Sequence, residues 1–198
     1  ESTQNSLSIS IYVNNRYSSH STNDLRKSEL ERFIQQAVEA TPYLTADEHR
    51  YLPDPKYYPS RFESDLKIRD LQYEILNSEQ RVQLAREIEG AAMAVSDKII
   101  SSTAGFSDTL YQSVKVHSNG FAGESEGTYF SAGAEATISD DSGGRPEDWY
   151  YATTRFYDEL PSAAFLGRQA VQRALRKVGQ SKIESGLYDM VVENRVGS

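Results

Sequence analysis

The sequence predicts an α+β protein, with mainly antiparallel sheets and three long amphipathic helices packed on one face. Two observations predict this class. Several segments alternate apolar and polar residues and follow one another through tight turns, which is typical of an antiparallel meander. Three longer segments place apolar residues at helical spacing, so each is expected to cover a sheet with its apolar side.

Residues 1–44 are expected to form an N-terminal α/β region that is incomplete at its start. SLSISIYV alternates as a strand does, and Asn14-Asn15 is a good hairpin turn before the return strand RYSSHST. The segment LRKSELERFIQQAVEATPYL is a helix that ends near Pro42. Its apolar face consists of Leu30, Phe33, Ile34, Ala37 and Val38.

Residues 45–76 are expected to be a Pro/Tyr-rich linker. The stretch has no sustained hydrophobic period and carries Pro53, Pro55 and Pro59, which favour extended backbone. A short helix near 63–70 is the only regular element that we expect in it.

Residues 77–180 are expected to form a middle α+β region that contains a four-stranded antiparallel meander. The region opens with a helix capped by Asn77 or Ser78. Its apolar stripe consists of Val82, Ala85, Ile88, Ala92 and Val95. Gly90-Ala91-Ala92 gives this helix a small-residue surface that another element could approach closely.

The four strands of the meander are expected in IISSTAGFS, TLYQSVKVHSNG, GTYFSAGAEATIS and WYYATTRFYDEL. Asn119-Gly120 is the strongest hairpin signal, because both residues tolerate positive φ. A third helix, SAAFLGRQAVQRALRKVG, ends with Gly179 at the position that follows a helix. Residues 181–198 are then expected to open a truncated C-terminal domain with a strand at 190–193.

The composition limits the classes of partner. The net charge of −8 repels phosphates, so direct nucleic-acid binding is not expected. The one basic cluster, RQAVQRALRKVGQSK, is interpreted as a solvated helix face, with a basic partner patch as the alternative. No apolar run approaches the ~20 residues needed to span a bilayer, so no membrane partner is expected. The chain has no cysteine, which fits a reducing compartment.

The sequence shows no self-contained catalytic or metal-binding set. The three histidines are His20, His49 and His117, and their spacing does not place two of them on one helix face. Neither a G-x-S-x-G elbow nor a phosphate-binding glycine fingerprint is present. The carboxylate pairs Asp140-Asp141 and Glu147-Asp148 flank a Gly-rich stretch and are interpreted as turn residues. We therefore expect that the chain holds no cofactor by itself.

Three stretches, in this order along the chain, together resemble the TldD/PmbA family, also described as modulators of DNA gyrase. ISIYVNNRYSSHSTNDL with the later YLPDP is similar to the N-terminal region of that family. VKVHSNGFAGESEGTYFSAGAEATIS with DWYYATTRFYDEL is similar to its middle region. KIESGLYDMVVENRVGS is similar to the start of its C-terminal domain, and VENRVGS looks closer to the PmbA-type branch.

The resemblance implies a zinc metallopeptidase of the bacterial cytoplasm, or its non-catalytic partner subunit, assembled as a homodimer or heterodimer around a proteolytic chamber. In the TldD-type branch an H-E-x-x-x-H zinc motif follows the strand that opens the C-terminal domain. This chain does not contain that motif, so the resemblance places any zinc chemistry outside it, and whether it is part of an active enzyme stays open. Its expected role is chamber wall, dimerisation surface and surface for a protein or peptide substrate.

The edge of SLSISIYV or of the tyrosine strand Trp149–Tyr157 is the candidate for that surface, because an extended peptide can add to a strand edge. The candidate residues are Tyr12, Trp149, Tyr150 and Tyr157; the alternative is that they only pack the sheet. Two other functions stay open. One is a standalone protein-binding adaptor module without catalysis, and the other is an unrelated small hydrolase with a triad assembled from distant residues.

Overall fold

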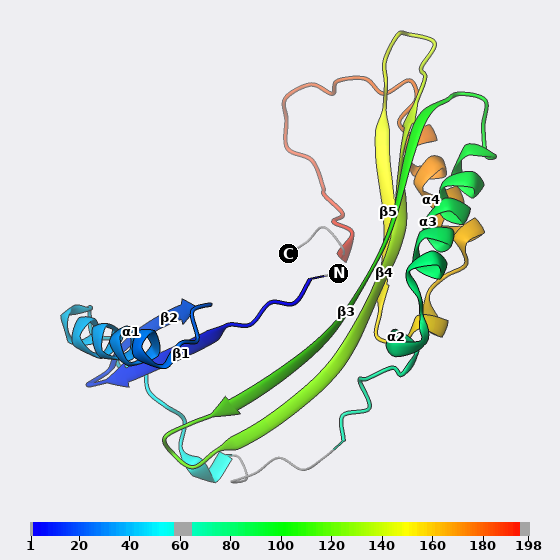
Figure 1. Ribbon diagram of the computed structural model, residues 1–198. Coiled ribbons are helices and arrows are strands. Elements are labelled where there is room, and N and C mark those ends of the chain that lie inside the picture. The colour runs from blue at the N-terminus through cyan, green and yellow to red at the C-terminus, as the bar shows by residue number, and fades with distance from the viewer. Residues whose placement is uncertain (1, 58–64, 195–198) are drawn as a thin grey trace. The chain divides into compact units, whose positions relative to one another are not determined.

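The computed structural model describes residues 2–57 and 65–194, and it combines helices with antiparallel sheets (Figure 1). This confirms the predicted α+β class. The chain divides into two compact units. The first unit contains the residues up to 64 together with 114–124, and the second contains the rest.

In the first unit, β1 (Leu7–Val13) and β2 (Arg16–Thr22) form an antiparallel hairpin. Its turn confirms the predicted Asn14-Asn15 position, and both residues have positive φ, 48° and 59°. Asparagine tolerates this left-handed backbone better than most residues do. α1 (Lys27–Ala40) follows the hairpin and continues into the 3-10 helix η1 (Thr41–Tyr43).

α1 is tied to the hairpin at its C-terminal end. The buried hydroxyls of Ser18 and Thr41 lie 2.6 Å apart, and the Thr41 hydroxyl donates to the Ala37 carbonyl at 2.8 Å. Two residues of the predicted apolar face, Ile34 and Val38, are nevertheless about half exposed. The hairpin therefore covers only part of that face.

The second unit is built on the sheet β3-β4-β5. Its strands are β3 (Ile99–Val116), β4 (Ala122–Ile138) and β5 (Glu147–Thr154), and the β3–β4 tip belongs to the first unit. The His117 N–H donates to the Phe121 carbonyl across that tip, and Gly120 has φ 97°. The predicted Asn119-Gly120 hairpin is therefore confirmed. β4 and β5 are antiparallel, from Phe130↔Thr154 to Thr137↔Glu147.

The predicted four-stranded meander has three strands, because IISSTAGFS and TLYQSVKV form one continuous strand. The sequence Gly105-Phe106-Ser107-Asp108 has the composition of a turn. Gly105 nevertheless lacks the positive φ that such a turn would need, and the Asp108 carboxylate is bound by Arg81 at 2.7 Å. A polar residue with a partner on the neighbouring helix is compatible with a strand interior.

The last predicted strand, Trp149–Tyr157, is also shorter than expected. β5 ends at Thr154, and Tyr157 opens the 3-10 helix η3 (Tyr157–Glu159). The Tyr157 N–H donates to the Asp70 carboxylate at 2.7 Å, so that donor is taken by a side chain and not by a strand.

Two helices cover one face of this sheet, α3 (Ser78–Met93) and α4 (Ala163–Leu175) (Figure 1). α3 starts with a capping box in which Asn77 and Gln80 exchange side-chain and backbone hydrogen bonds, which confirms Asn77 as the cap. The fully buried residues of this helix-covered face include Ile88, Phe130, Ala132, Ala134, Ile138, Leu166, Ala170 and Val171.

The small-residue surface predicted at Gly90-Ala91-Ala92 is where α4 approaches α3. A Cβ atom added to Gly167 would lie 2.5 Å from the Ile88 carbonyl oxygen and 2.6 Å from the Ala92 nitrogen. The two helix backbones therefore touch at a point where only glycine fits. Val82 of the predicted apolar stripe is 49% exposed, whereas Ile88 and Ala92 are fully buried. The buried part of the stripe is therefore centred on Ile88 and Ala92 and does not extend to Val82.

The predicted shared face is found for α3 and α4, whereas α1 packs in the first unit. The amphipathic character of all three helices stays a prediction. The described part of the linker contains η2 (Pro55–Tyr57) and the short α2 (Gln72–Ile75). The short helix expected near 63–70 partly falls on residues 63–64, outside the described residues, and 65–70 is not helical.

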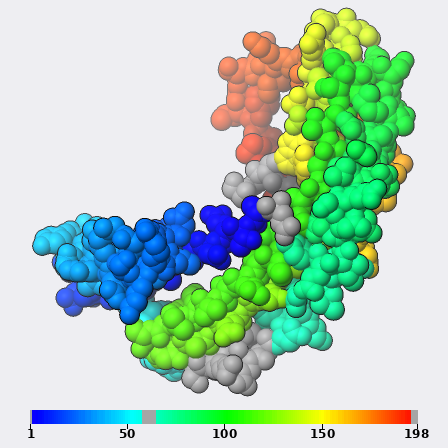
Figure 2. All heavy atoms as spheres, in the orientation of Figure 1, coloured from blue at the N-terminus to red at the C-terminus, as the bar shows by residue number. Residues whose placement is uncertain are grey.

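Residues 180–194, the tail, leave α4 without forming the strand predicted at 190–193. A strand needs a hydrogen-bonded neighbour, and none pairs with this segment in the described part of the chain. Arg173 of α4 binds the Glu193 carboxylate at 3.0 Å and thereby anchors the tail. In Figure 2 the tail, orange to red, lies on the side of the yellow β5 away from the green α3.

The boundaries at 44, 76 and 180 that the sequence indicates stay predictions. The two compact units are defined by contacts between residues and not by sequence order, and the first unit includes residues 114–124. No helix of the described ranges is both long and apolar enough to cross a bilayer.

Candidate functional site

The sheet of the second unit has a second face, opposite α3 and α4, which we call the outer face. Side chains alternate along a strand, so residues between the buried Phe130, Ala132 and Ala134 of β4 point to the outer face. The register with β5 places the odd-numbered residues of that strand on the same side. The outer face includes Tyr111, Gly127, Tyr129, Ser131, Gly133, Glu135, Trp149, Tyr151 and Thr153.

Two tyrosines and one arginine meet on this face, and we call them the Arg155 cluster. The rings of Tyr111 and Tyr129 are stacked, with centroids 5.5 Å apart and planes at 22°. Arg155 follows directly after β5, with its Cζ 4.4 Å from the Tyr129 ring centroid. Its Nη1 donates to the Tyr111 hydroxyl at 3.2 Å and its Nη2 to the Tyr129 hydroxyl at 2.8 Å.

Thr128 fixes the backbone of the cluster from the other side of the sheet. This side chain is fully buried, accepts a hydrogen bond from the Asp70 N–H at 2.9 Å and donates one to the Arg155 carbonyl at 2.8 Å. The Thr128 N–H in turn donates to the Ile68 carbonyl at 3.0 Å. The end of β5 is therefore held between β4 and the segment that precedes α2.

The charge of Arg155 has no carboxylate partner within ion-pair distance in the described residues. Other half-buried arginines differ, since Arg81 binds Asp108 and Arg173 binds both Asp148 and Glu193. The hydrogen bond to Tyr111 raises the pKa of Arg155, desolvation opposes that effect, and the interaction with Tyr129 adds to it. The guanidinium is therefore a permanent cation on the outer face.

A second aromatic group lies further along the outer face. Trp149 and Tyr151 have ring centroids 5.9 Å apart, and Trp149 is 40% exposed. Tyr151 covers Gly133, where an added Cβ would lie 2.6 Å from its Cδ1 atom and 2.2 Å from the Tyr150 carbonyl. Between the two aromatic groups the hydroxyls of Thr153 and Ser131 lie 3.0 Å apart.

The four predicted surface residues lie in different surroundings, each within its own unit. Tyr12 lies in the first unit, where its ring is 5.0 Å from that of Tyr17. Tyr150 and Tyr157 point to the helix-covered face: Tyr150 packs edge-on against Phe165 at 5.8 Å. Trp149 is the only one of the four on the outer face. A peptide-binding role for these residues stays a prediction.

Tyr157 packs on two core rings, 6.2 Å from Phe106 and 5.7 Å from Phe130.

Sequence reasoning missed the Arg155 cluster, although one signal was present. The Asn119-Gly120 hairpin places Tyr111 opposite Gly127 and diagonal to Tyr129, so the pair follows from the register of that turn.

The carboxylates near the turn between β4 and β5 have structural partners. Asp140 accepts hydrogen bonds from the N–H groups of Gly179 and Ser142, which lower the pKa of its carboxyl group. Asp148 is bound by Lys177 at 3.1 Å and by Arg173 at 3.4 Å. Burial acts to raise the pKa of Asp148, but the Trp149 N–H and these two cations outweigh it and lower the pKa.

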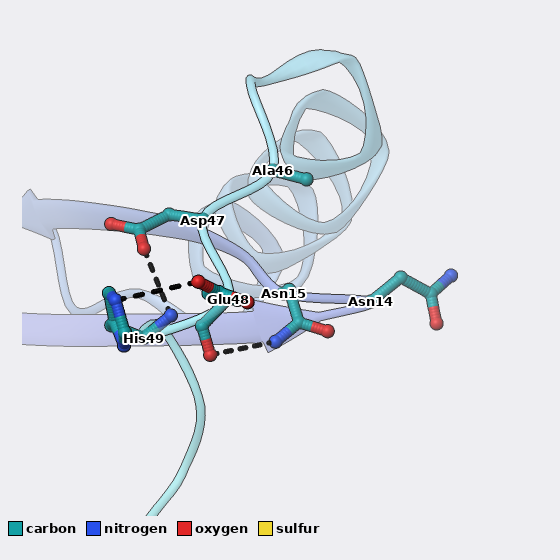
Figure 3. A pocket seen from close by; sticks show the side chains of 6 residues that line it. All are labelled: Asn14, Asn15, Ala46, Asp47, Glu48 and His49. Carbon is teal, nitrogen blue, oxygen red and sulfur yellow. Dashed lines mark hydrogen bonds and ion pairs between the residues drawn. The ribbon is translucent and has the colours of Figure 1, made fainter.

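A hollow of about 620 Å³ lies in the first unit beside the β1–β2 turn (Figure 3). The Asn15 side-chain amide donates to the Glu48 carbonyl at 3.2 Å, and the Asp47 N–H donates to the Asn15 carbonyl at 2.7 Å. The Asp47 carboxylate also accepts from the His49 N–H at 2.9 Å. These hydrogen bonds join the β1–β2 turn to residues 46–49, and the groups that line the hollow are therefore used to hold these two segments together.

The zinc ion that the resemblance implies does not fit the described residues. No group of three or more His, Cys, Asp or Glu side chains in residues 2–57 and 65–194 could hold a metal ion. His20 packs edge-on against Phe33 and His117 lies 5.0 Å from Phe121, ring to ring. His49 is exposed, with Glu48 at 3.7 Å.

Comparison with known proteins gives a consistent result. Residues 73–178 match the model of the PmbA/TldA metallopeptidase central domain. The chain is 25% identical, over 97% of its length, to metalloprotease PmbA of Escherichia coli O157:H7, and covers 42% of that protein. It is 36% identical, with a TM-score of 0.78, to the crystal structure of a candidate modulator of DNA gyrase from Bacteroides thetaiotaomicron.

That structural similarity covers 91% of this chain and 41% of the Bacteroides protein. A corresponding protein from Thermotoga maritima shares the fold, with a TM-score of 0.62, 15% identity and coverage of 92% of this chain and 40% of the other. The chain thus spans about two fifths of the length of the relatives that it matches.

Proposed function

The chain belongs to the PmbA/TldD metallopeptidase family, and from this premise we propose that it forms a non-catalytic part of such a peptidase or of its partner subunit. In this proposal it supplies a wall of the proteolytic chamber, a surface for the substrate peptide and a surface for a second family member. Zinc chemistry, where it occurs, is carried out by residues outside this chain. The assembly is proposed to be a homodimer or heterodimer that acts in the cytoplasm.

The observation that carries the proposal is the outer face, within the region that matches the family model. This face presents aromatic rings and hydroxyls where the opposite face presents a packed core. Aromatic side chains with polar tips provide contact area at low entropic cost, and hydroxyls can bond to peptide groups. The outer face is therefore proposed as the wall along which an extended substrate lies.

The described residues act by binding and orienting the peptide. Two backbone constraints keep this surface in place: Thr128 holds the end of β5, and Gly133 leaves room for the Tyr151 side chain beside β4. A rigid surface restricts the substrate before it reaches the catalytic residues, and such restriction lowers the entropic cost of reaction.

The test uses the full-length protein with its partner subunit. Replacing both Tyr129 and Tyr151 by Ala should raise KM for peptide cleavage about tenfold and leave kcat nearly unchanged, because the change removes binding distant from the reacting atoms. Val82→Ala, on the exposed side of α3, is the matched control and should change neither constant. An unchanged KM in the double variant would argue against a peptide-binding wall.

A protein-binding adaptor without catalysis is the second candidate function. It is favoured by the description of the Bacteroides and Thermotoga relatives as candidate modulators of DNA gyrase. An adaptor would bind its protein partner equally well after zinc is removed by chelation, and the full assembly would show no peptidase activity. Zinc-dependent cleavage by the assembly would exclude this function as the sole one.

A further inference from the structure

We propose that the Arg155 cluster is a subsite for the carboxylate of an acidic side chain, Asp or Glu, in an extended substrate peptide. This proposal rests on the peptide-binding role of the outer face and adds a preference for one class of residue. The Tyr111 and Tyr129 hydroxyls and the Arg155 guanidinium are the groups that would contact the ligand.

The hydrogen-bonding capacity of the cluster points to an acceptor ligand. A guanidinium has five N–H donors, and Arg155 uses two of them on the phenol oxygens. Each phenol oxygen accepts one of these bonds and keeps its own O–H to donate. Three N–H and two O–H donors therefore have no acceptor among the described residues, and a carboxylate, which only accepts, satisfies such a set best.

The charge of the cluster points in the same direction. The chain carries a net charge of −8, yet none of its described carboxylates is within ion-pair distance of Arg155. Arg173, by contrast, binds two carboxylates, Asp148 and Glu193. A half-buried cation without an anionic partner in an acidic protein is electrostatically complementary to an anion supplied from outside.

The geometry restrains the guanidinium before a ligand arrives. Its Cζ lies 4.4 Å from the Tyr129 ring centroid, and its two terminal nitrogens are bonded to hydroxyls of two strands. Thr128 in turn donates to the backbone carbonyl of Arg155. A restrained planar donor loses less conformational entropy on binding than a flexible lysine would.

A side chain in the middle of a peptide fits this location better than a chain terminus does. The outer face continues past the cluster, with Gly127 on one side and Ser131 and Thr153 on the other. An extended peptide can therefore run through the subsite. A nucleic acid is a poorer fit, because one guanidinium does not offset the repulsion between a phosphate backbone and this acidic chain.

The test measures binding of two fluorescent peptides to the full-length protein in its assembly. The peptides are extended, amidated at the C-terminus and identical except for Glu or Gln at one central position. We expect the Glu peptide to bind about tenfold more tightly at low salt, which is the scale of a charge-assisted hydrogen-bonded pair. The difference should shrink as salt is added.

Arg155→Gln should abolish the preference for Glu, and Arg155→Lys should retain only part of it, because an ammonium keeps the charge but lacks the planar fork of five donors. Arg168→Gln, an exposed arginine of α4, is the matched control and should keep the full preference. The wild-type comparison of the two peptides tests the proposal even if a variant folds poorly.

Equal binding of the Glu and Gln peptides by the wild type would overturn this proposal while leaving the peptide-binding wall intact. A preference that persists in Arg155→Gln would overturn it as well. Arg155-dependent binding of a free C-terminus alone, or of an oligonucleotide, would assign the cluster to a different ligand and contradict the proposal. Failure of both peptides to bind would contradict the proposed function itself.

Discussion

The two faces of the β3-β4-β5 sheet are made by alternate residues of the same strands, yet they differ in what surrounds them. Phe130 is fully buried beside the rings of Phe106 and Tyr157, whereas its neighbour Tyr129 is 38% exposed and stacks on Tyr111. One face is completed by this chain, and the other presents donors and rings that the described residues leave accessible. The helix-covered face therefore accounts for stability, and the outer face is where we look for binding.

The largest expected difference is between neighbouring residues of β4. Phe130→Ala should lower the free energy of unfolding by roughly 3–5 kcal/mol, because it leaves a cavity in the core. Tyr129→Ala should cost about 1 kcal/mol, the scale of a lost aromatic pair. Urea unfolding followed by circular dichroism measures both. Equal losses for the two variants would contradict the division of the sheet into a core face and an outer face.

The contact between α3 and α4 gives the next largest effect. Gly167→Ala should destabilise the protein by roughly 2–3 kcal/mol, since its Cβ would collide with the backbone of α3. Gly90→Ala, at a helical position with nothing within 4 Å, is the matched control and should stabilise by about 0.5–1 kcal/mol. Comparison of the two melting temperatures checks the prediction, and a neutral Gly167→Ala would show that the helices can separate without cost.

The ion pairs at the start of β5 should contribute less and depend on pH. The side chain of Asp148 is 14% exposed, and its pKa is lowered in the folded protein, so the contribution is present above the unfolded-state pKa of about 4 and is lost as pH falls through the lower folded value. Asp148→Asn should therefore cost about 1–2 kcal/mol at pH 7. The gap to the wild type should narrow below pH 4; a gap that is constant with pH would argue against the charge interaction.

The smallest effect on the free energy of unfolding is expected at the exposed hydroxyls of the outer face. Thr153→Ala removes an exposed hydroxyl that is bonded to Ser131, and it should change the free energy of unfolding by less than about 0.5 kcal/mol. Thermal unfolding measures this directly. A loss above 1 kcal/mol would mean that the outer face contributes to stability more than its exposure indicates.

The comparison of the two faces also shows what local sequence can reveal. The turns at Asn14-Asn15 and Asn119-Gly120 and the cap at Asn77 depend on a few neighbouring residues, and all three are confirmed. The small-residue surface on α3 was also visible in the sequence, although its partner, Gly167, was identified only by the packing.

Other features depend on contacts between distant segments, and the sequence did not reveal them. In the sequence, Asp108 looked like a turn residue that interrupts β3. Its partner, Arg81, lies on a helix 27 residues earlier, so the local sequence does not show that this carboxylate is bound within a strand. The Arg155 cluster combines one position on β3, one on β4 and the residue after β5, and their proximity follows from the register of the sheet. Tyr150 and Tyr157 resemble surface tyrosines in the sequence, but strand alternation and the hydrogen bond to Asp70 turn them towards the core.

The most direct test of the account is to map where a substrate peptide touches the second unit. A photo-crosslinking amino acid is placed at Thr153 on the outer face or at the exposed Glu89 on α3, in the full-length assembly. The account predicts that the peptide crosslinks at position 153 and not at position 89. Crosslinking at position 89 alone, or equally at both positions, would contradict the claim that the outer face is the peptide-binding wall.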